Sequence, residues 1–186
     1  MILEINRIKK VSDMLCSGHS ILRDKYRCRA LLLDSIMLAI SVWLTAMIFV
    51  EPNIGNKLTP FSFSRELWLG ILAIIAFFFS VIQIRVNWKE LADAHQRACD
   101  FYGKIKIECN SLIDDVDANI STEAFNKIKD MYVTAGEVNI CIPESKFNNL
   151  KKAHKLKIEI SKILDMKPAS SIIFLKIKLW YRDNLK

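Results

Sequence analysis

The polar residues of this chain that could do chemistry lie inside two long apolar runs of the sequence. In the first run, 31–50, Asp34, Ser41 and Thr45 lie along one face of an expected helix. In the second run, 67–84, small and polar residues recur at helical spacing: Ala73, Ala76, Ser80 and Gln83. In such a setting they either pack against a neighbouring helix or line a path for water and ions. The stripes alone favour packing, and both interpretations stay open.

Asp34 is the most informative of these side chains, because a carboxylate is costly to bury in lipid without a partner or water. It is the only charged residue of the 31–50 run. Its place in an apolar run therefore favours a functional role. Pairing with Arg29 or Arg85, which lie near the inner ends of the two runs, would instead give it a structural role.

No known enzyme motif is present in the sequence. It has neither G-x-S-x-G nor H-E-x-x-H, no glycine-rich phosphate loop, and only five glycines in 186 residues. The histidines His19, His95 and His154 share no ligand spacing with cysteine or carboxylate, so packed or solvated helix positions are expected for them. We therefore expect no catalytic residues, no cofactor and no enzymatic activity.

Metal and disulfide sites are not indicated either. The run Asp114, Asp115, Asp117, Asn119 resembles a calcium loop, but counting from Asp115 the glycine expected sixth is Ile120, and the glutamate expected twelfth is Asn126. A solvated turn before a helix capped by Ser121 or Thr122 is expected instead. The five cysteines form no C-x-x-C pair, so reduced thiols are expected. They are Cys16, Cys28, Cys99, Cys109 and Cys141.

The two apolar runs are long enough to cross a bilayer. Residues 67–84 carry no charge over 18 positions, and residues 31–50 carry only Asp34 over 20. The alternative is a central helix of a soluble all-α domain. Between the runs, residues 51–66 hold two prolines and a glycine, which predicts a short loop joining antiparallel spans. Phe61, Phe63 and Trp68 would form an aromatic belt at its exit.

Basic residues predict the orientation of this hairpin. The flank before it, in residues 5–30, holds seven, and residues 85–106 hold five, against Lys57 and Arg65 in the loop. Since positive charge stays inside, both termini should be cytoplasmic and the loop external. Within the second span, one side should face lipid and the Ala73–Gln83 stripe should face another helix or water. The lipid side consists of Trp68, Leu72, Ile75 and Phe79.

The cytosolic part should be helical throughout. Residues 1–30 form an amphipathic helix, weakened near Ser17-Gly18. After the second span we expect one unbroken helix from Glu66 to about Val116, carrying a coiled-coil seam that packs on the N-terminal helix and supports assembly. The seam consists of Trp88, Leu91, His95, Ala98, Tyr102, Ile105, Cys109, Leu112 and Val116.

Two further helices, 122–135 and about 145–165, complete a cytosolic helical domain of residues 85–167. The basic, apolar tail 168–186 fits a helix or a strand, with helix favoured, and could lie on the inner leaflet. The fold expected is an all-α membrane protein, a two-transmembrane hairpin extended into a cytosolic helical bundle. The net charge of +7 then fits an anionic membrane surface better than nucleic acid, which we do not expect the chain to bind directly.

This layout resembles the SLATT family, the SMODS and SLOG-associating two-transmembrane effector domains of bacterial conflict systems. The resemblance runs from about His19 to Leu164 and includes RVNWKELADAHQRACDFY, ISTEAFNKIKDMY, EVNICIPES and SKFNNLKKAHKLKIEISKIL. It implies an inner-membrane, homo-oligomeric effector that disrupts the bilayer in antiphage defence. It also implies a triggering partner: a sensor, a nucleotide synthase or a reverse transcriptase.

The alternative to this effector is a membrane adaptor that does not permeabilise the bilayer. Its hairpin would only anchor the cytosolic helices, which would recruit a soluble partner. The seam from Trp88 to Val116 would then matter, and the polar residues of the spans would not.

Overall fold

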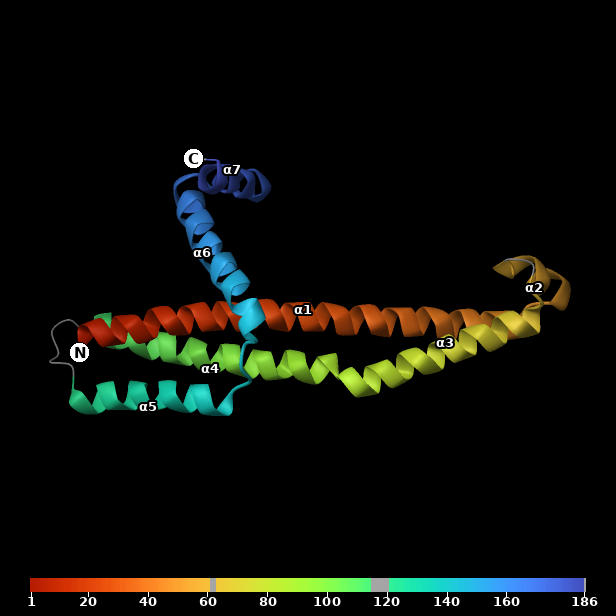
Figure 1. The fold of residues 1–186 in the computed structure, drawn as a ribbon, viewed down its shortest axis with the longest axis horizontal. Coiled ribbons are helices and arrows are strands. Elements are labelled where there is room, and N and C mark those ends of the chain that lie inside the picture. The colour runs from red at the N-terminus through yellow and green to blue at the C-terminus, as the bar shows by residue number, and fades with distance from the viewer. Residues whose placement is uncertain (61–62, 115–120, 186) are drawn as a thin grey trace. The chain divides into compact units, whose positions relative to one another are not determined.

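The computed structural model describes residues 1–60, 63–114 and 121–185, and every regular element in these ranges is a helix. The all-α class is therefore confirmed. The helices are α1 (Ile2–Phe49), α2 (Pro52–Leu58), α3 (Arg65–Val86), α4 (Trp88–Asp114), α5 (Thr122–Val138), α6 (Glu144–Met166) and α7 (Ile172–Asn184), as Figure 1 shows. Phe61 of the loop, Val116 of the seam, and Asp115, Asp117, Asn119 and Ile120 of the calcium-like run lie outside the described residues.

The chain divides into two compact units. The hairpin unit is Arg23–Asp93, and the bundle unit combines Met1–Leu22 with Ala94–Lys186. The hairpin unit is longer at both ends than the 31–84 hairpin expected from hydropathy. The reason is that α1 continues unbroken before the first span, and the unit takes in the start of α4 after the second.

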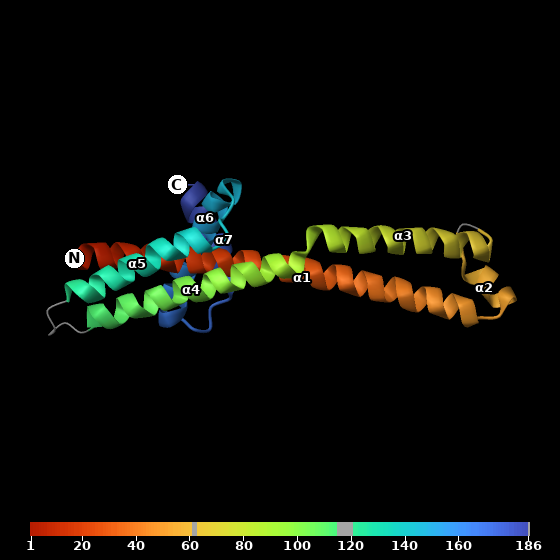
Figure 2. The same cartoon turned by 90° about the horizontal axis from the view of Figure 1, so that it is seen from below.

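The hairpin unit is an antiparallel pair made by α3 and the part of α1 that follows Leu22 (Figure 2). Two helical stretches, Ile2–Phe49 and Arg65–Asp114, are long and apolar enough to cross a membrane by length and composition. Only 11% and 6% of their most apolar windows are buried, so nearly all of that apolar surface is open. Two candidate transmembrane helices are therefore present, as expected.

The segment between the spans is not simply a loop. Pro52–Leu58 forms α2, with proline in its first turn, where the missing N–H costs no hydrogen bond. The Oγ1 atom of Thr59 donates a hydrogen bond to the carbonyl of Phe63 at 2.9 Å. The sequence prediction of an irregular 51–66 loop was wrong in this respect.

The helix does not run unbroken from Glu66 to Val116, as the sequence had suggested. Asn87 takes a left-handed conformation, with φ 42° and ψ 57°, and separates α3 from α4. Asparagine tolerates this conformation better than other residues with a side chain. Its side chain also donates to the Glu90 carboxylate at 2.6 Å and accepts from the Glu90 amide at 3.4 Å. Asn87 therefore ends one helix and starts the next.

The core of the bundle unit lies between α1, α4 and α5. Its buried members are Ile5, Ile8, Tyr102, Ile105, Cys109, Ile128 and Ala135. The N-terminal helix is thus the packing partner of α4, as predicted. Figures 1 and 2 both show α5 lying beside α4 within this unit.

Gly18 does not weaken α1, which continues through it. A Cβ at this position would lie 3.0 Å from the side chain of Ile142 and 3.7 Å from that of Leu150. The absence of a side chain at Gly18 leaves room for Ile142, from the segment between α5 and α6, to pack against α1. The expectation of a weakened helix at Ser17-Gly18 was wrong for this reason.

The remaining helices follow the predicted positions within a few residues. Ser121 caps α5 by accepting from the Glu123 amide at 3.2 Å. After Pro168 the tail forms α7, so the choice between helix and strand is resolved in favour of helix. Leu175 and Leu179 bury one side of α7 against Ile160 of α6.

Candidate functional site

Asp34 forms the only charged node within the expected spans, taken over the residues that the structure describes. Its Oδ1 atom accepts a hydrogen bond from the Gln83 amide at 2.9 Å, and its Oδ2 atom lies 2.8 Å from the Lys89 ammonium. The two carboxylate oxygens therefore each have one partner, one from α3 and one from α4. Asp34 and Gln83, predicted on two separate stripes, meet across the hairpin.

The expected ion-pair partner of Asp34 was wrong. The sequence pointed to Arg29 or Arg85, whereas the structure uses Lys89. Lys89 becomes available because Asn87 redirects the chain and places the first turn of α4 beside α1. The pair is only partly shielded from solvent, because the Asp34 and Lys89 side chains are 34% and 63% exposed.

A small cavity of about 80 Å³ lies beside this node. Apolar side chains from α1, α3 and α4 form most of its lining, and its polar groups include Asp34 and Gln83. A cavity of this size with such polar partners holds one or a few waters. The node can therefore hold water or a small cation next to a carboxylate at one end of the hairpin, and its residues have no arrangement for covalent chemistry.

The other polar residues of the spans do not meet across the hairpin. The Thr45 hydroxyl donates to the carbonyl of Ser41 at 2.8 Å, within the same helix, and both residues are exposed. Ala73 is exposed, while Ala76 and Ser80 are half-buried. Helix packing therefore uses only part of the predicted stripes, and Ser41, Thr45 and Ala73 remain on the open surface.

The face of α3 that contacts α1 is built from large residues. Leu72 is buried, and Trp68 and Phe79 are half-buried, whereas Ile75 is exposed. The assignment of Trp68, Leu72 and Phe79 to a lipid side was therefore wrong. The antiparallel pair is close enough at its ends to bury large side chains along one stripe, which small residues alone do not fill.

A second link closes the other end of the hairpin. The guanidinium of Arg65 donates to the carbonyls of Met47 and Ile48 at 2.6 and 2.9 Å. These are C-terminal carbonyls of α1, whose last turn holds no basic residue of its own. A cation at a helix C-terminus satisfies free carbonyls and complements the helix dipole. Sequence reasoning counted Arg65 only as a loop charge.

The bundle unit pairs two of the histidines that look isolated in the sequence and places the third against α1. The Nδ1 atoms of His19 and His95 lie 2.9 Å apart, so one ring donates and the other accepts. The ring of Tyr102 stacks on His19 with centroids 5.7 Å apart. His154 of α6 hydrogen-bonds Ser17 of α1 at 3.0 Å. The signal was hidden because the three residues lie far apart along the chain.

Burial keeps the His19–His95 pair uncharged. Burial, and to a smaller extent the neighbouring His95, lower the pKa of His19 to about 4. The pKa of His95 is lowered by burial first and by the nearby Lys146 second. Both rings therefore act as neutral core residues at physiological pH.

Two thiols lie near this pair. The sulfur atoms of Cys16 and Cys99 are 3.0 Å apart, and both residues are half-buried. Among the described residues no three or more histidines, cysteines or carboxylates converge as a metal site. The cluster therefore acts as packing between α1 and α4.

The predicted assembly seam is largely internal to this chain. His95, Tyr102 and Ile105 are buried, while Trp88, Leu91 and Leu112 are half-buried. Their periodicity correctly marks the inner face of α4. Assembly of several copies stays a prediction and requires other surfaces, because this face already packs on α1 and α5.

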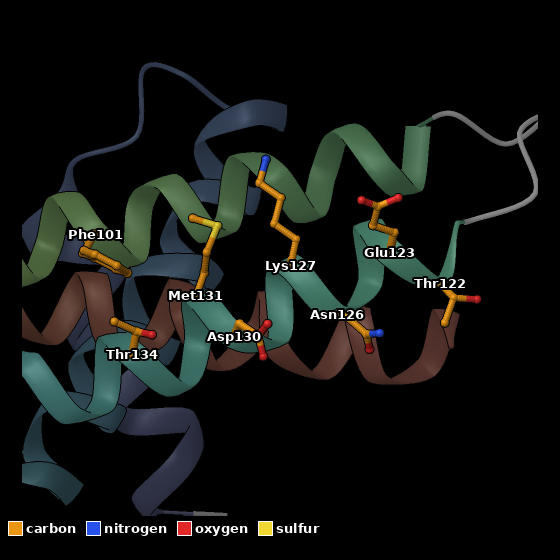
Figure 3. Close-up of a pocket in the computed structure, with 8 residues that line it drawn as sticks. All are labelled: Phe101, Thr122, Glu123, Asn126, Lys127, Asp130, Met131 and Thr134. Atoms are coloured by element: carbon orange, nitrogen blue, oxygen red, sulfur yellow. The ribbon is translucent and has the colours of Figure 1, made fainter.

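A groove of the bundle unit lies between α4 and α5, with a volume of about 740 Å³. Figure 3 shows its lining along successive turns of α5, with Phe101 contributed by α4. Its charged residues, Glu123, Lys127 and Asp130, are all exposed. The groove is therefore an open helix surface without a shielded reactive group.

Comparisons with protein-family models, curated proteins and solved structures give no match to this chain.

Proposed function

We propose that this chain is a multi-pass protein of the bacterial inner membrane that oligomerises and, when triggered, permeabilises or depolarises that membrane. In this proposal both termini are cytoplasmic, and the segment around α2 is external. The antiphage role comes from the SLATT resemblance alone. The trigger would come from a sensor, nucleotide-synthase or reverse-transcriptase partner, as that resemblance implies.

The observation that carries the proposal is the Asp34 node at one end of an otherwise apolar hairpin. The exposed apolar surface of α1 and α3 suits lipid, yet a carboxylate and its amide partner lie beside a cavity large enough for water. One hairpin has two helices and encloses no aqueous path, so permeation requires several copies. The exposed hydroxyl of Ser41 and the nearby Thr45 lie on the same helix as Asp34 and would extend a polar path.

Breaking the Asp34–Lys89 ion pair should also lower the stability of the hairpin only slightly. Partly exposed ion pairs contribute about 0–1 kcal/mol, so Lys89 can leave Asp34 without unfolding the hairpin. Asp34 and Gln83 would then be free to contact water or a neighbouring copy after triggering. This exchange is the mechanistic step that we propose.

Membrane potential in bacterial cells tests the proposal. After induction of the full chain together with its native trigger, a potential-sensitive dye should report depolarisation. Asp34→Asn and Gln83→Leu should reduce depolarisation and killing at unchanged abundance. Asp93→Asn, a change of the same kind at an exposed position of the same unit, should not. Full depolarisation by both node variants would assign the node to packing alone.

The adaptor function is the second candidate, and one observation favours it. The hydroxyls of Ser35 and Thr45 are already bonded to carbonyls of their own helix, at 2.8 Å each, so they do not need water. Replacing the spans by an unrelated two-helix hairpin separates the two functions. An adaptor keeps working after the exchange, whereas a permeabilising effector loses its effect.

A further inference from the structure

Helix α7 has two apolar faces, and only one of them is covered. Leu175 and Leu179 pack on α6 around Ile160. On the other side, five large side chains are each more than half exposed, and we name them the outer face of α7. They are Ile173, Phe174, Ile177, Trp180 and Tyr181.

The helical geometry separates these two faces cleanly. Successive residues turn by about 100° around an α-helix, so Ile173 and Ile177 point away from Leu175 and Leu179. The same rotation puts Lys176 and Lys178 on the two borders between the faces. Both lysines are exposed and make no ion pair within the described part of the chain. The outer face is thus an apolar strip with a basic residue on each side.

Charge and residue type identify what fits this strip. The only acidic residue of α7 is Asp183, which pairs with Arg182 at 2.8 Å. Tryptophan and tyrosine are favoured where a bilayer meets water, and lysines beside an apolar strip extend to anionic headgroups. The exposed side of the adjacent α6 is polar by contrast, with Lys151, Lys152 and Lys155 among its residues. The outer face of α7 therefore differs from the exposed side of α6, the helix on which α7 packs.

We propose that the outer face of α7 docks in the plane of an anionic lipid bilayer surface. Its aromatic and aliphatic side chains enter the headgroup boundary, and Lys176 and Lys178 contact lipid phosphates. Such helices bind by buried apolar area together with attraction to anionic lipid. This inference rests on the proposed membrane location, and it does not depend on permeabilisation.

Fluorescence of Trp180 tests the docking in the full chain. The chain carries Trp43→Phe, Trp68→Phe and Trp88→Phe, so that Trp180 is the sole tryptophan, and is placed in lipid nanodiscs with one copy per disc. With phosphatidylglycerol present, lipids brominated near the headgroup end of their acyl chains should quench roughly half or more of the Trp180 emission. Lys176→Glu with Lys178→Glu should lower the docked fraction roughly tenfold.

The matched control is Lys104→Glu with Lys129→Glu, which makes the same charge change at exposed positions of α4 and α5 and should leave the quenching intact.

Acrylamide quenching as strong as in detergent, with no effect of brominated lipid, would overturn the proposal. Protection that appears only with two copies per disc would also overturn it, by assigning the face to a second copy. If the triple tryptophan variant misfolds, hydrogen exchange of residues 172–184 in the unmodified chain tests the docking instead. Docking should slow the exchange of these amides in anionic discs and not in neutral ones. Leakage assays play no part in these readouts.

Discussion

In the bundle unit, polar side chains are found inside the protein, whereas in the hairpin unit large apolar side chains are found outside. His19, His95 and His154 are buried in the bundle unit, and each has a hydrogen-bond partner. Leu38, Ile74 and Phe77 are mostly exposed on the hairpin unit. A core that accepts paired polar groups is typical of a unit surrounded by water. An exposed surface of this apolar character is suited to lipid.

The difference teaches that one α-helix can present two kinds of surface along its length. Residues of α1 up to Leu22 contribute Ile5 and Ile8 to a buried core. Residues of the same helix from Leu31 onward expose leucine and isoleucine. The helix is therefore continuous between the two units, and only the burial of its apolar side chains differs from one unit to the other.

Truncation of a buried isoleucine should give the largest difference in stability between the two units. Ile105→Ala in the bundle core should destabilise that unit by about 2–5 kcal/mol, because it leaves a cavity in a fully buried site. Ile74→Ala, at an exposed position of the hairpin unit, should leave the stability of the bundle unit unchanged. Hydrogen exchange of the α4 amides in detergent measures both. Equal effects of the two substitutions would contradict the division.

An arginine introduced at an exposed apolar position should affect membrane insertion in the hairpin unit and not in the bundle unit. Phe78→Arg should oppose membrane insertion by about 3 kcal/mol, because it puts a guanidinium near the middle of a span. Ile107→Arg on α4 is a comparable change, since the two side chains are 62% and 68% exposed, and it should have no effect on insertion. The membrane-inserted fraction of each variant is the measurement. Normal insertion of Phe78→Arg would show that α3 does not span.

Acid should weaken the bundle unit through the His19–His95 pair. The folded-state pKa of His19, about 4, lies below its unfolded value of 6.5. The unfolded chain therefore binds more protons between these values, and stability is complete above pH 6.5 and lost as the pH falls towards 4. The loss is at most on the order of 3 kcal/mol.

Thermal melting of the full chain in detergent between pH 7.5 and pH 4.5 measures this effect. Tyr102, Lys146 and the His154–Asp13–Lys106 group are the other titratable side chains that face or neighbour the pair. His19→Leu with His95→Leu should flatten the acid-induced loss, and His154→Gln should retain it. A loss of the same size in the double variant would assign it to other groups.

The smallest effect is expected at the Asp34 node. Asp34→Asn should change hairpin stability by less than about 1 kcal/mol, because the Lys89 pair is partly exposed. Thermal melting of the full chain in detergent tests this directly. A loss of several kcal/mol would mean that the carboxylate is a structural buried charge and would remove the argument that it is free to exchange partners.

Periodicity and hydropathy predicted the elements better than the places where the chain turns. The inner face of α4 was predictable, because Tyr102 and Ile105 recur with the spacing of a buried stripe. The break at Asn87 was missed, although an asparagine followed three residues later by Glu90 is a helix-start pattern. That single left-handed residue determines that Lys89, rather than Arg85, reaches Asp34.

Contacts between distant segments could not be predicted from one sequence. His19 meets His95, and His154 meets Ser17, only after α1, α4 and α6 have packed. The burial of Leu72 was also missed, because hydropathy does not distinguish a leucine that faces lipid from one that faces a helix. For the same reason, hydropathy could not tell which face of α7 packs on α6 and which is exposed, since both faces are apolar.

The most direct test is ion release from liposomes that contain the purified full chain and its native trigger. Because one hairpin cannot enclose a path, release should rise more steeply than in proportion to the protein-to-lipid ratio, and Asp34→Asn should weaken it. Inserted, oligomeric wild-type protein that leaves the vesicles tight under these conditions would contradict the permeabilising function.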